Sequence, residues 1–188
     1  MINLLLQSAL AYQKLLTLTY HVALGHKGVL THMRIVFPEN AYHHMAGFQY
    51  VGFTSLQNRS AALQTILSGK TTQRHFIEAG YVPNAKYDLA DRWQSICHLQ
   101  EMLENDMVTY YYRGHEPHWA RIKADYVLCN PSQYFFIRNE EPVSVFGNRN
   151  QGYEKKCTRY TTLQVTRINI VTLESVTVYR SPSFKEPS

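Results

Sequence analysis

The spacing of the apolar residues changes near residue 106, and this change divides the chain into a helical first part and a strand-rich second part. Before that point, apolar side chains mostly recur at three- and four-residue intervals, as in helices with one buried face. After it, apolar and polar residues alternate, as in strands with one buried face. We therefore expect an α+β fold, in which N-terminal helices pack on one face of a mainly antiparallel sheet of about four to six strands.

The same patterns predict the individual elements. Helices are expected at residues 2–24, 61–67, 72–80 and 86–105, and a short helix is expected after Asn40, a residue type that caps helices well. Strands are expected at residues 30–37, 107–113, 119–128, 134–138, 143–146, 160–173 and 175–180.

The length of the chain, 188 residues, suits one domain with a substantial core. We expect a single domain over residues 1–180 and a frayed tail over residues 181–188. No apolar run reaches the roughly 20 residues that a transmembrane helix needs. Three widely spaced cysteines, Cys97, Cys129 and Cys157, match neither a disulfide framework nor a zinc ribbon.

The first six residues are apolar enough to resemble the start of a secretory signal. They lack a preceding basic segment, and Gln7, Gln13 and Lys14 interrupt the apolar run. We therefore expect a cytoplasmic protein that does not contact a membrane.

The net charge is +5, and most of the excess lies in the second part of the chain. A basic segment over residues 149–167 contains only one acidic residue, Glu154, and could contact phosphate groups of a nucleic acid. The alternative is a solvated basic loop beside a strand. The candidate nucleic-acid-binding residues in this segment are Arg149, Lys155, Lys156, Arg159 and Arg167.

Motifs for metals and common cofactors are missing from the sequence. His43 and His44 are adjacent, so on a helix their side chains point about 100° apart. His115 and His118 have no partner pair of cysteines or histidines at metal-site spacing. The sequence contains neither a glycine-rich phosphate loop nor a nucleophile elbow. We expect no metal and no cofactor.

A basic stripe is expected on one predicted strand. Arg121, Lys123 and Asp125 alternate with apolar neighbours, so their side chains leave the same side of the strand. Such a stripe is commonly just a solvated face. It would gain a function if a proton acceptor lay beside it, and His44 is the best candidate because histidine titrates near neutral pH. Ser144 is a further hydroxyl candidate.

Three segments together resemble a known family. Phe37–Phe48 is similar to a Phe-x-aromatic-x-His-Leu-x-Gly-Leu signature that follows a strand. Lys123–Leu128 resembles a Lys-x-Ala-Asp-Tyr strand, and Tyr134–Ile137 followed by Pro142–Phe146 resembles an aromatic strand and a Pro-x-Ser-Phe-Phe segment. In this order they resemble a phage-associated branch of the barnase–EndoU–colicin–RelE-like nucleases.

The resemblance implies metal-independent cleavage of RNA, in which the ribose 2′-hydroxyl attacks its own phosphate. That step needs a base, a cation near the phosphate and a donor for the leaving 5′-oxygen. We expect His44 to act as acid or base, Arg121 and Lys123 to hold the phosphate, and Ser144 or Tyr126 to serve as an accessory donor. Tyr126 lies on the opposite strand face from Lys123 by simple alternation, so its inclusion requires an irregularity in the strand.

Other functions remain open at this point. The same fold could belong to a catalytically inactive RNA-binding or anti-defence protein, to an interaction protein of a mobile element, or to a transferase. The expected partner is RNA, with an antitoxin or host protein as a second possibility. An enzyme requires His44 and Lys123 in one cleft, whereas a binding protein requires only the basic face and exposed aromatic residues.

Overall fold

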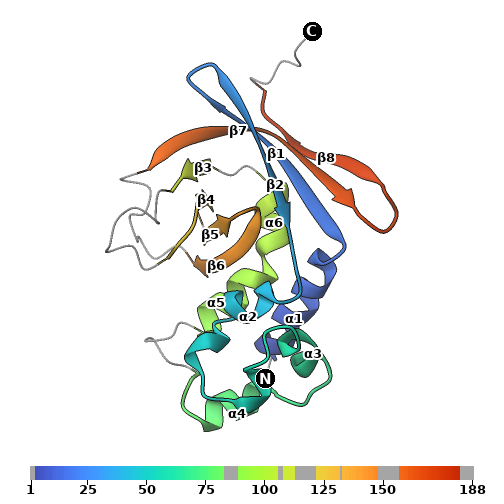
Figure 1. Cartoon of the computed structure of the whole chain (residues 1–188), viewed down its shortest axis with the longest axis vertical. Coiled ribbons are helices and arrows are strands. Elements are labelled where there is room, and N and C mark those ends of the chain that lie inside the picture. Colours follow the sequence, from blue (N-terminus) through green and yellow to red (C-terminus); the bar gives the residue numbers. More distant parts are fainter. Residues whose placement is uncertain are drawn as a thin grey trace.

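The computed structural model describes residues 3–82, 89–105, 108–112, 122–131, 133–147 and 157–182. Most of its helices gather at one end of the molecule and its strands at the other, and the last helices run alongside the strands (Figure 1). The helices are α1 (Leu4–Leu15), α2 (Ala41–Met45), α3 (Ala62–Leu67), α4 (Gln73–Glu78), α5 (Leu89–Cys97) and α6 (Leu99–Glu104), and two short 3-10 helices cover Phe48–Tyr50 and Thr54–Leu56.

The strands form one curled, entirely antiparallel sheet of eight strands among the described residues. Its order is β2-β1-β7-β3-β4-β5-β6, and β8 pairs with the second half of β7. The α+β class is confirmed, but the sheet has more strands than the four to six expected. The strands are β1 (Leu18–His26), β2 (Val29–Val36), β3 (Val108–Tyr111), β4 (Tyr126–Cys129), β5 (Gln133–Arg138), β6 (Glu141–Gly147), β7 (Thr158–Asn169) and β8 (Ser175–Arg180).

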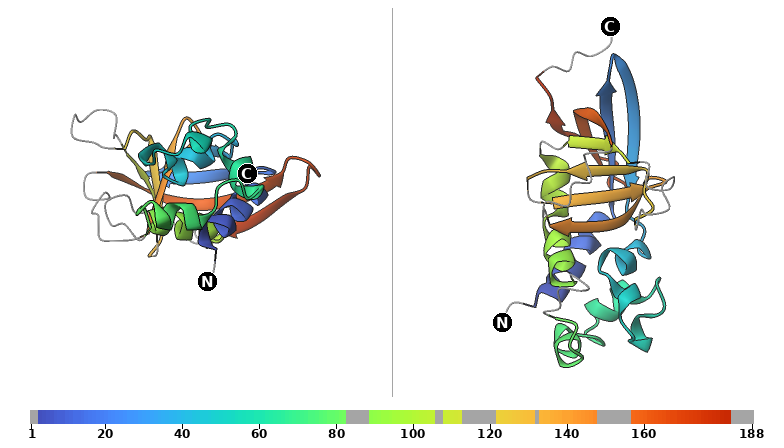
Figure 2. Two further views of the ribbon diagram at one scale, coloured as in Figure 1. Left: turned by 90° about the horizontal axis from the view of Figure 1, so that it is seen from below. Right: turned by 90° about the vertical axis from the view of Figure 1, so that its left-hand side faces the viewer.

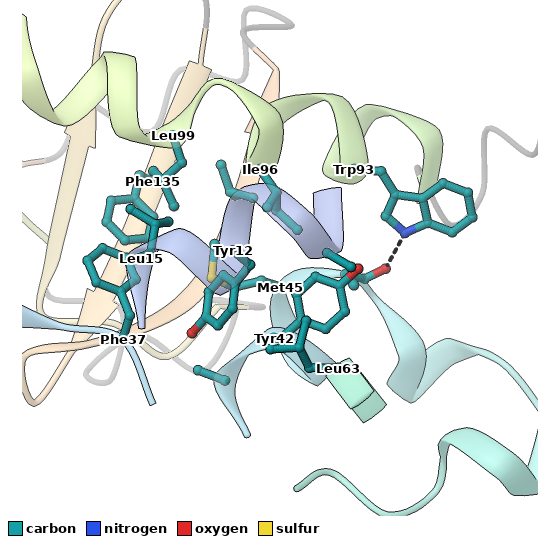
Figure 3. Close-up of a cluster of buried hydrophobic side chains, with 14 of the residues drawn as sticks. Tyr12, Leu15, Phe37, Tyr42, Met45, Leu63, Trp93, Ile96, Leu99 and Phe135 are labelled. Atoms are coloured by element: carbon teal, nitrogen blue, oxygen red, sulfur yellow. Dashed lines mark hydrogen bonds between the residues drawn. The ribbon is translucent and has the colours of Figure 1, made fainter. Parts of the chain in front are cut away.

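The main core lies between the helices and the concave side of this sheet. Figure 3 shows side chains that several elements contribute to this core, among them Tyr12 and Leu15 of α1, Trp93 and Ile96 of α5, and Phe135 of β5. All five side chains are almost completely buried. Burial of such large apolar groups is the dominant stabilising term in a fold of this size.

A second, smaller cluster lies on the other face of β4 and β5. It contains Val127 and Phe136, which alternate with Leu128 and Phe135 of the main core. These strands are therefore apolar on both faces. Ile122, Val143 and Phe146 are partly buried and pack against the edge of the second cluster.

The helix expected at residues 2–24 is wrong beyond its first half. The chain forms α1 and then β1, which pairs with β2 on one side and β7 on the other. A central strand is buried on both faces and shows a nearly continuous apolar run, which periodicity alone does not distinguish from a buried helix. Tertiary pairing decided the conformation of this segment.

Two other expected elements differ from those observed. The helix expected at 86–105 is split at His98 into α5 and α6 within its described part. The strand expected at 119–128 begins only at Tyr126, because residues 122–125 do not have strand conformation, and residues 119–121 lie outside the described part. Ala124 consequently packs in the same cluster as Val127, so the simple alternation expected there fails.

Within the described residues, no helix combines the length and apolar character needed to span a membrane. Residues 183–188 of the expected tail lie outside the described part.

Candidate nucleic-acid cleft

Three of the predicted site residues line one cleft of about 650 Å³. His44 reaches it from α2, Lys123 from the segment before β4, and Ser144 from β6. The two views of Figure 2 show how these elements come together: the helices α5 and α6 run along one side of β5 and β6, and α2 lies below the same strands. Segments about 100 residues apart in the sequence therefore share one concave surface.

Helix α2 presents His44 because its other side chains hold the helix in the core. Ala41, Tyr42, His43 and Met45 are buried, whereas His44 is half-buried at the cleft. The Tyr42 hydroxyl shares a hydrogen bond of 2.9 Å with the Ser8 hydroxyl of α1. The expected short helix after Asn40 is confirmed, although the Asn40 side chain makes no capping hydrogen bond.

The surroundings of His44 favour its neutral form. Burial lowers the pKa of the imidazole, and the positive charges of Arg59 and Arg92 lower it further. The neighbouring His43 also has a lowered pKa, first because of burial and then because of His44 and Arg59. A neutral imidazole at pH 7 can accept a proton from a hydroxyl.

Arg92 of α5 is a cleft residue that the sequence analysis missed. Only 4% of it is exposed. Its Nη1 donates to the Ser144 hydroxyl at 3.0 Å, and to the carbonyl oxygens of His44 and Met45 at 3.3 and 3.4 Å. The guanidinium thus connects two predicted site residues and places a positive charge at the floor of the cleft.

Aromatic rings flank this guanidinium. Its Cζ lies 4.2 Å from the centre of the Phe146 ring and 5.5 Å from the centre of the Tyr50 ring. Contacts of this kind stabilise an arginine that has lost its water. One sequence signal pointed to Arg92: it occupies the same helical stripe as Leu89 and Ile96, where a charged residue is unusual.

Close packing between α2 and α5 holds Arg92 in place. The Trp93 indole donates to the Ala46 carbonyl at 3.1 Å (Figure 3). Gly47 follows with φ of +80°, and a Cβ atom there would lie 2.7 Å from Leu89 Cδ2 and 3.0 Å from Arg92 Cδ. Only glycine fits this combination of left-handed backbone and close approach.

The turn between β5 and β6 forms another part of the cleft wall, with Arg138 and Glu141 on it. Asn139 donates its backbone N–H to Asp125 Oδ2 at 2.9 Å, and the Glu140 carbonyl accepts from Val36 N–H at 3.0 Å. The turn is thereby fixed both to the segment before β4 and to the end of β2.

Positive charges outnumber negative ones among the described residues of the cleft. Arg92, Lys123 and Arg138 face a single carboxylate, that of Glu141. Lys123 is exposed, so its ammonium can reach a ligand. This charge balance suits a phosphate-containing ligand. Arg121, which was expected beside Lys123, lies outside the described residues.

Tyr126 does not line the cleft. Its ring packs against the main core, 5.5 Å from the ring centre of Tyr111, and burial is the main cause of its raised pKa. The chain before Tyr126 is irregular, because residues 122–125 do not have strand conformation, but it is Ala124 that packs in the second cluster, whereas Tyr126 stays on the main-core face.

The predicted nucleic-acid-binding residues lie elsewhere or outside the description. Arg149, Lys155 and Lys156 are outside the described residues. Arg159 is exposed on β7, and Arg167 donates to Glu104 Oε1 at 2.7 Å, where the Tyr20 hydroxyl also donates at 2.9 Å. Neither β7 residue lines the cleft, so their contact with nucleic acid stays a prediction. Among the described residues, no group of three or more histidine, cysteine or acidic side chains is arranged to hold a metal ion.

Comparisons with known proteins bear on which family the chain belongs to. Neither the curated proteins nor the solved structures yield a match. A family model described as phage-Barnase-EndoU-ColicinE5/D-RelE like nuclease4 matches residues 4–181, which include every described element and the whole cleft. The chain therefore belongs to this family of phage-associated nucleases.

Proposed function

We propose that the protein is an endoribonuclease that cleaves RNA without a metal ion, by attack of a ribose 2′-hydroxyl on the adjacent phosphate. The observation that carries this proposal is the meeting of His44, Lys123 and Ser144 in one positively charged cleft. The family membership supports a nucleic-acid substrate. A histidine base beside cations is a combination that the 2′-hydroxyl reaction can use without a metal.

Each group has a role in the proposed reaction. His44 accepts the proton of the 2′-hydroxyl as its oxygen bonds to phosphorus. Lys123 and Arg138 neutralise the phosphate oxygens, and Arg121 is proposed to assist them. The bond from phosphorus to the 5′-oxygen then breaks with its electron pair on that oxygen, which takes up a proton from water while Ser144 donates a hydrogen bond to it. His44 afterwards returns its proton to the solvent.

Ser144 is suited to this role because Arg92 orients it. Its oxygen accepts a hydrogen bond from Arg92 Nη1, which leaves the hydroxyl hydrogen available to another acceptor. Tyr126 has no part in the proposal, because it packs in the core rather than in the cleft.

The test is a cleavage assay on single-stranded and structured RNA with EDTA present. The parent protein is expected to produce ends with 2′,3′-cyclic phosphates. His44→Ala and Lys123→Ala should each lower the rate by about 100-fold or more, the usual value of a positioned proton acceptor or phosphate contact. His21→Ala and Lys14→Ala, which change residues outside the cleft, serve as matched controls and should cleave like the parent.

A second candidate function rests on the charge of the cleft alone. A catalytically inactive RNA-binding or anti-defence protein would retain RNA, lose it in Lys123→Ala but not in His44→Ala, and produce no cleavage. That result would contradict the nuclease proposal. An antitoxin or host protein partner and a cytoplasmic location remain further proposals.

A further inference from the structure

Tyr50 is unusual among the aromatic residues of this protein. It is 46% exposed, whereas every other aromatic side chain in the described ranges is buried or half-buried. Phe48, two residues earlier in the same 3-10 helix, is only 2% exposed. A large ring left in water forgoes the free energy of burial that the other rings gain.

The exposed ring lies at the cleft rather than on an unrelated surface. Tyr50 and Gln49 are cleft residues, together with Lys123 and Arg138. The Arg92 guanidinium lies 5.5 Å from the centre of the Tyr50 ring. An exposed ring therefore adjoins the groups that suit a phosphate.

The turn at Gly47 accounts for this placement. Its φ of +80° ends α2 and starts the 3-10 helix, which buries Phe48 against Tyr42 and Phe76. With Phe48 fixed in the core, the next two residues, Gln49 and Tyr50, are left at the surface of the cleft. The position of Tyr50 thus follows from the same backbone turn that admits Arg92.

We propose that Tyr50 stacks on a nucleobase of the bound RNA, next to the phosphate that the cleft cations hold. Single-stranded RNA offers unstacked bases, and aromatic side chains beside cationic groups are the usual surfaces that receive them. The amide of Gln49 lies at the same rim and can hydrogen-bond the edge of that base. This inference rests on the proposed function in taking RNA as the substrate.

Binding to RNA that cannot be cleaved tests the stacking role separately from catalysis. The probe is a short fluorescein-labelled single strand with 2′-fluoro groups in place of the 2′-hydroxyls, and its Kd is measured by fluorescence anisotropy. Tyr50→Ala should raise the Kd about tenfold, within the range found for one stacked base. Tyr50→Phe keeps the ring and should bind like the parent. Ile77→Ala removes an exposed apolar side chain of α4 and is the matched control.

A base-deletion series distinguishes stacking from a structural role. When an abasic site is moved along the probe, the parent should lose affinity strongly at one position, and Tyr50→Ala should lose none there. If Tyr50→Ala raises the Kd by the same factor for every abasic probe, the ring supports the cleft without stacking, and the proposal is overturned.

The same measurements separate this proposal from the proposed nuclease activity. Parent protein that binds the probe with the expected Tyr50 dependence, yet does not cleave ordinary RNA, would support the stacking site and overturn the nuclease. If the parent protein cleaves RNA and Tyr50→Ala binds the probe as well as the parent does, the nuclease proposal is supported and the stacking site is overturned. Absence of probe binding by the parent would overturn the stacking site, and absence of cleavage of ordinary RNA as well would overturn both proposals.

Discussion

A histidine that is half-buried between two arginine charges loses its proton more readily than a histidine in water. His44 is in this position, because burial, Arg59 and Arg92 all disfavour its imidazolium form. Its lowered pKa lies below 6.5, so at pH 7 the group is neutral and able to act as a base. In the proposed reaction, the acid limb of the kcat/KM–pH profile should therefore lie at a lower pH than an unperturbed histidine would give.

Removal of one of these arginine charges should raise the pKa of His44 and shift the acid limb of the kcat/KM–pH profile to higher pH. In Arg59→Gln the imidazolium loses a repulsive neighbour, so the pKa of His44 should rise toward 6.5. The acid limb of the kcat/KM profile should shift to higher pH with it. An NMR titration of the His44 ring measures the pKa without relying on activity. Arg74→Gln on α4 is the control, and an unchanged or lower pKa in Arg59→Gln would contradict the prediction.

At the scale of elements, the cleft depends on how closely α5 approaches the end of α2. Gly47 permits this approach, since a side chain there would meet Leu89 and Arg92. Gly28 has nearly the same φ, +79°, but nothing lies within 4 Å of an added Cβ. The two glycines therefore separate backbone strain from steric overlap.

Alanine at both positions makes this comparison measurable. Gly28→Ala should lower the free energy of unfolding by about 1 kcal/mol, the cost of a left-handed alanine. Gly47→Ala should lower it by about 3 kcal/mol, because overpacking adds to that strain. Only Gly47→Ala should also lose RNA cleavage at temperatures where it is still folded. Urea unfolding and the cleavage assay check both points, and equal effects of the two substitutions would contradict the packing argument.

At the scale of the whole molecule, the net charge of +5 attracts RNA from all sides, but the cleft should account for specific phosphate contacts. Each phosphate contact to a single strand contributes about −0.7 to the slope of log K against log salt concentration. Lys123→Gln and Arg138→Gln should each make the slope shallower by about 0.7. Lys14→Gln, away from the cleft, should leave it unchanged. Arg159→Gln in the same titration decides whether β7 contributes a further contact.

The fold class could be predicted because it depends on local patterns. The helical stripe of α5 reflects one buried face, which is visible in the sequence, and β5 is visible as a short run of aromatic and β-branched residues. The N-terminal strand β1 was missed for the opposite reason. It pairs along its two edges with β2 and β7, and side chains on both of its faces, such as Val22 and Ala23, are buried, so its apolar residues show no period that distinguishes a strand from a helix.

The candidate site was predicted only in part. His44, Lys123 and Ser144 were chosen by residue type and by resemblance, and the structure places them in one cleft. Arg92 and Tyr50 were not chosen, because neither has a sequence motif of its own. Their importance comes from contacts with residues of other elements, such as the hydrogen bond from Arg92 to Ser144.

By itself, the sequence determined the α+β class, most strands of the second part, the excess of positive charge and the resemblance to the nuclease family. The first three follow from composition and short-range periodicity and the resemblance rests on short motifs, none of which requires the chain to be folded. Only the tertiary structure decided which charges share a surface, which arginine is buried under the cleft and which ring remains in water. Those features depend on contacts between residues tens of positions apart. Strands from distant parts of the chain pair in one sheet, and α5 packs against the turn after α2.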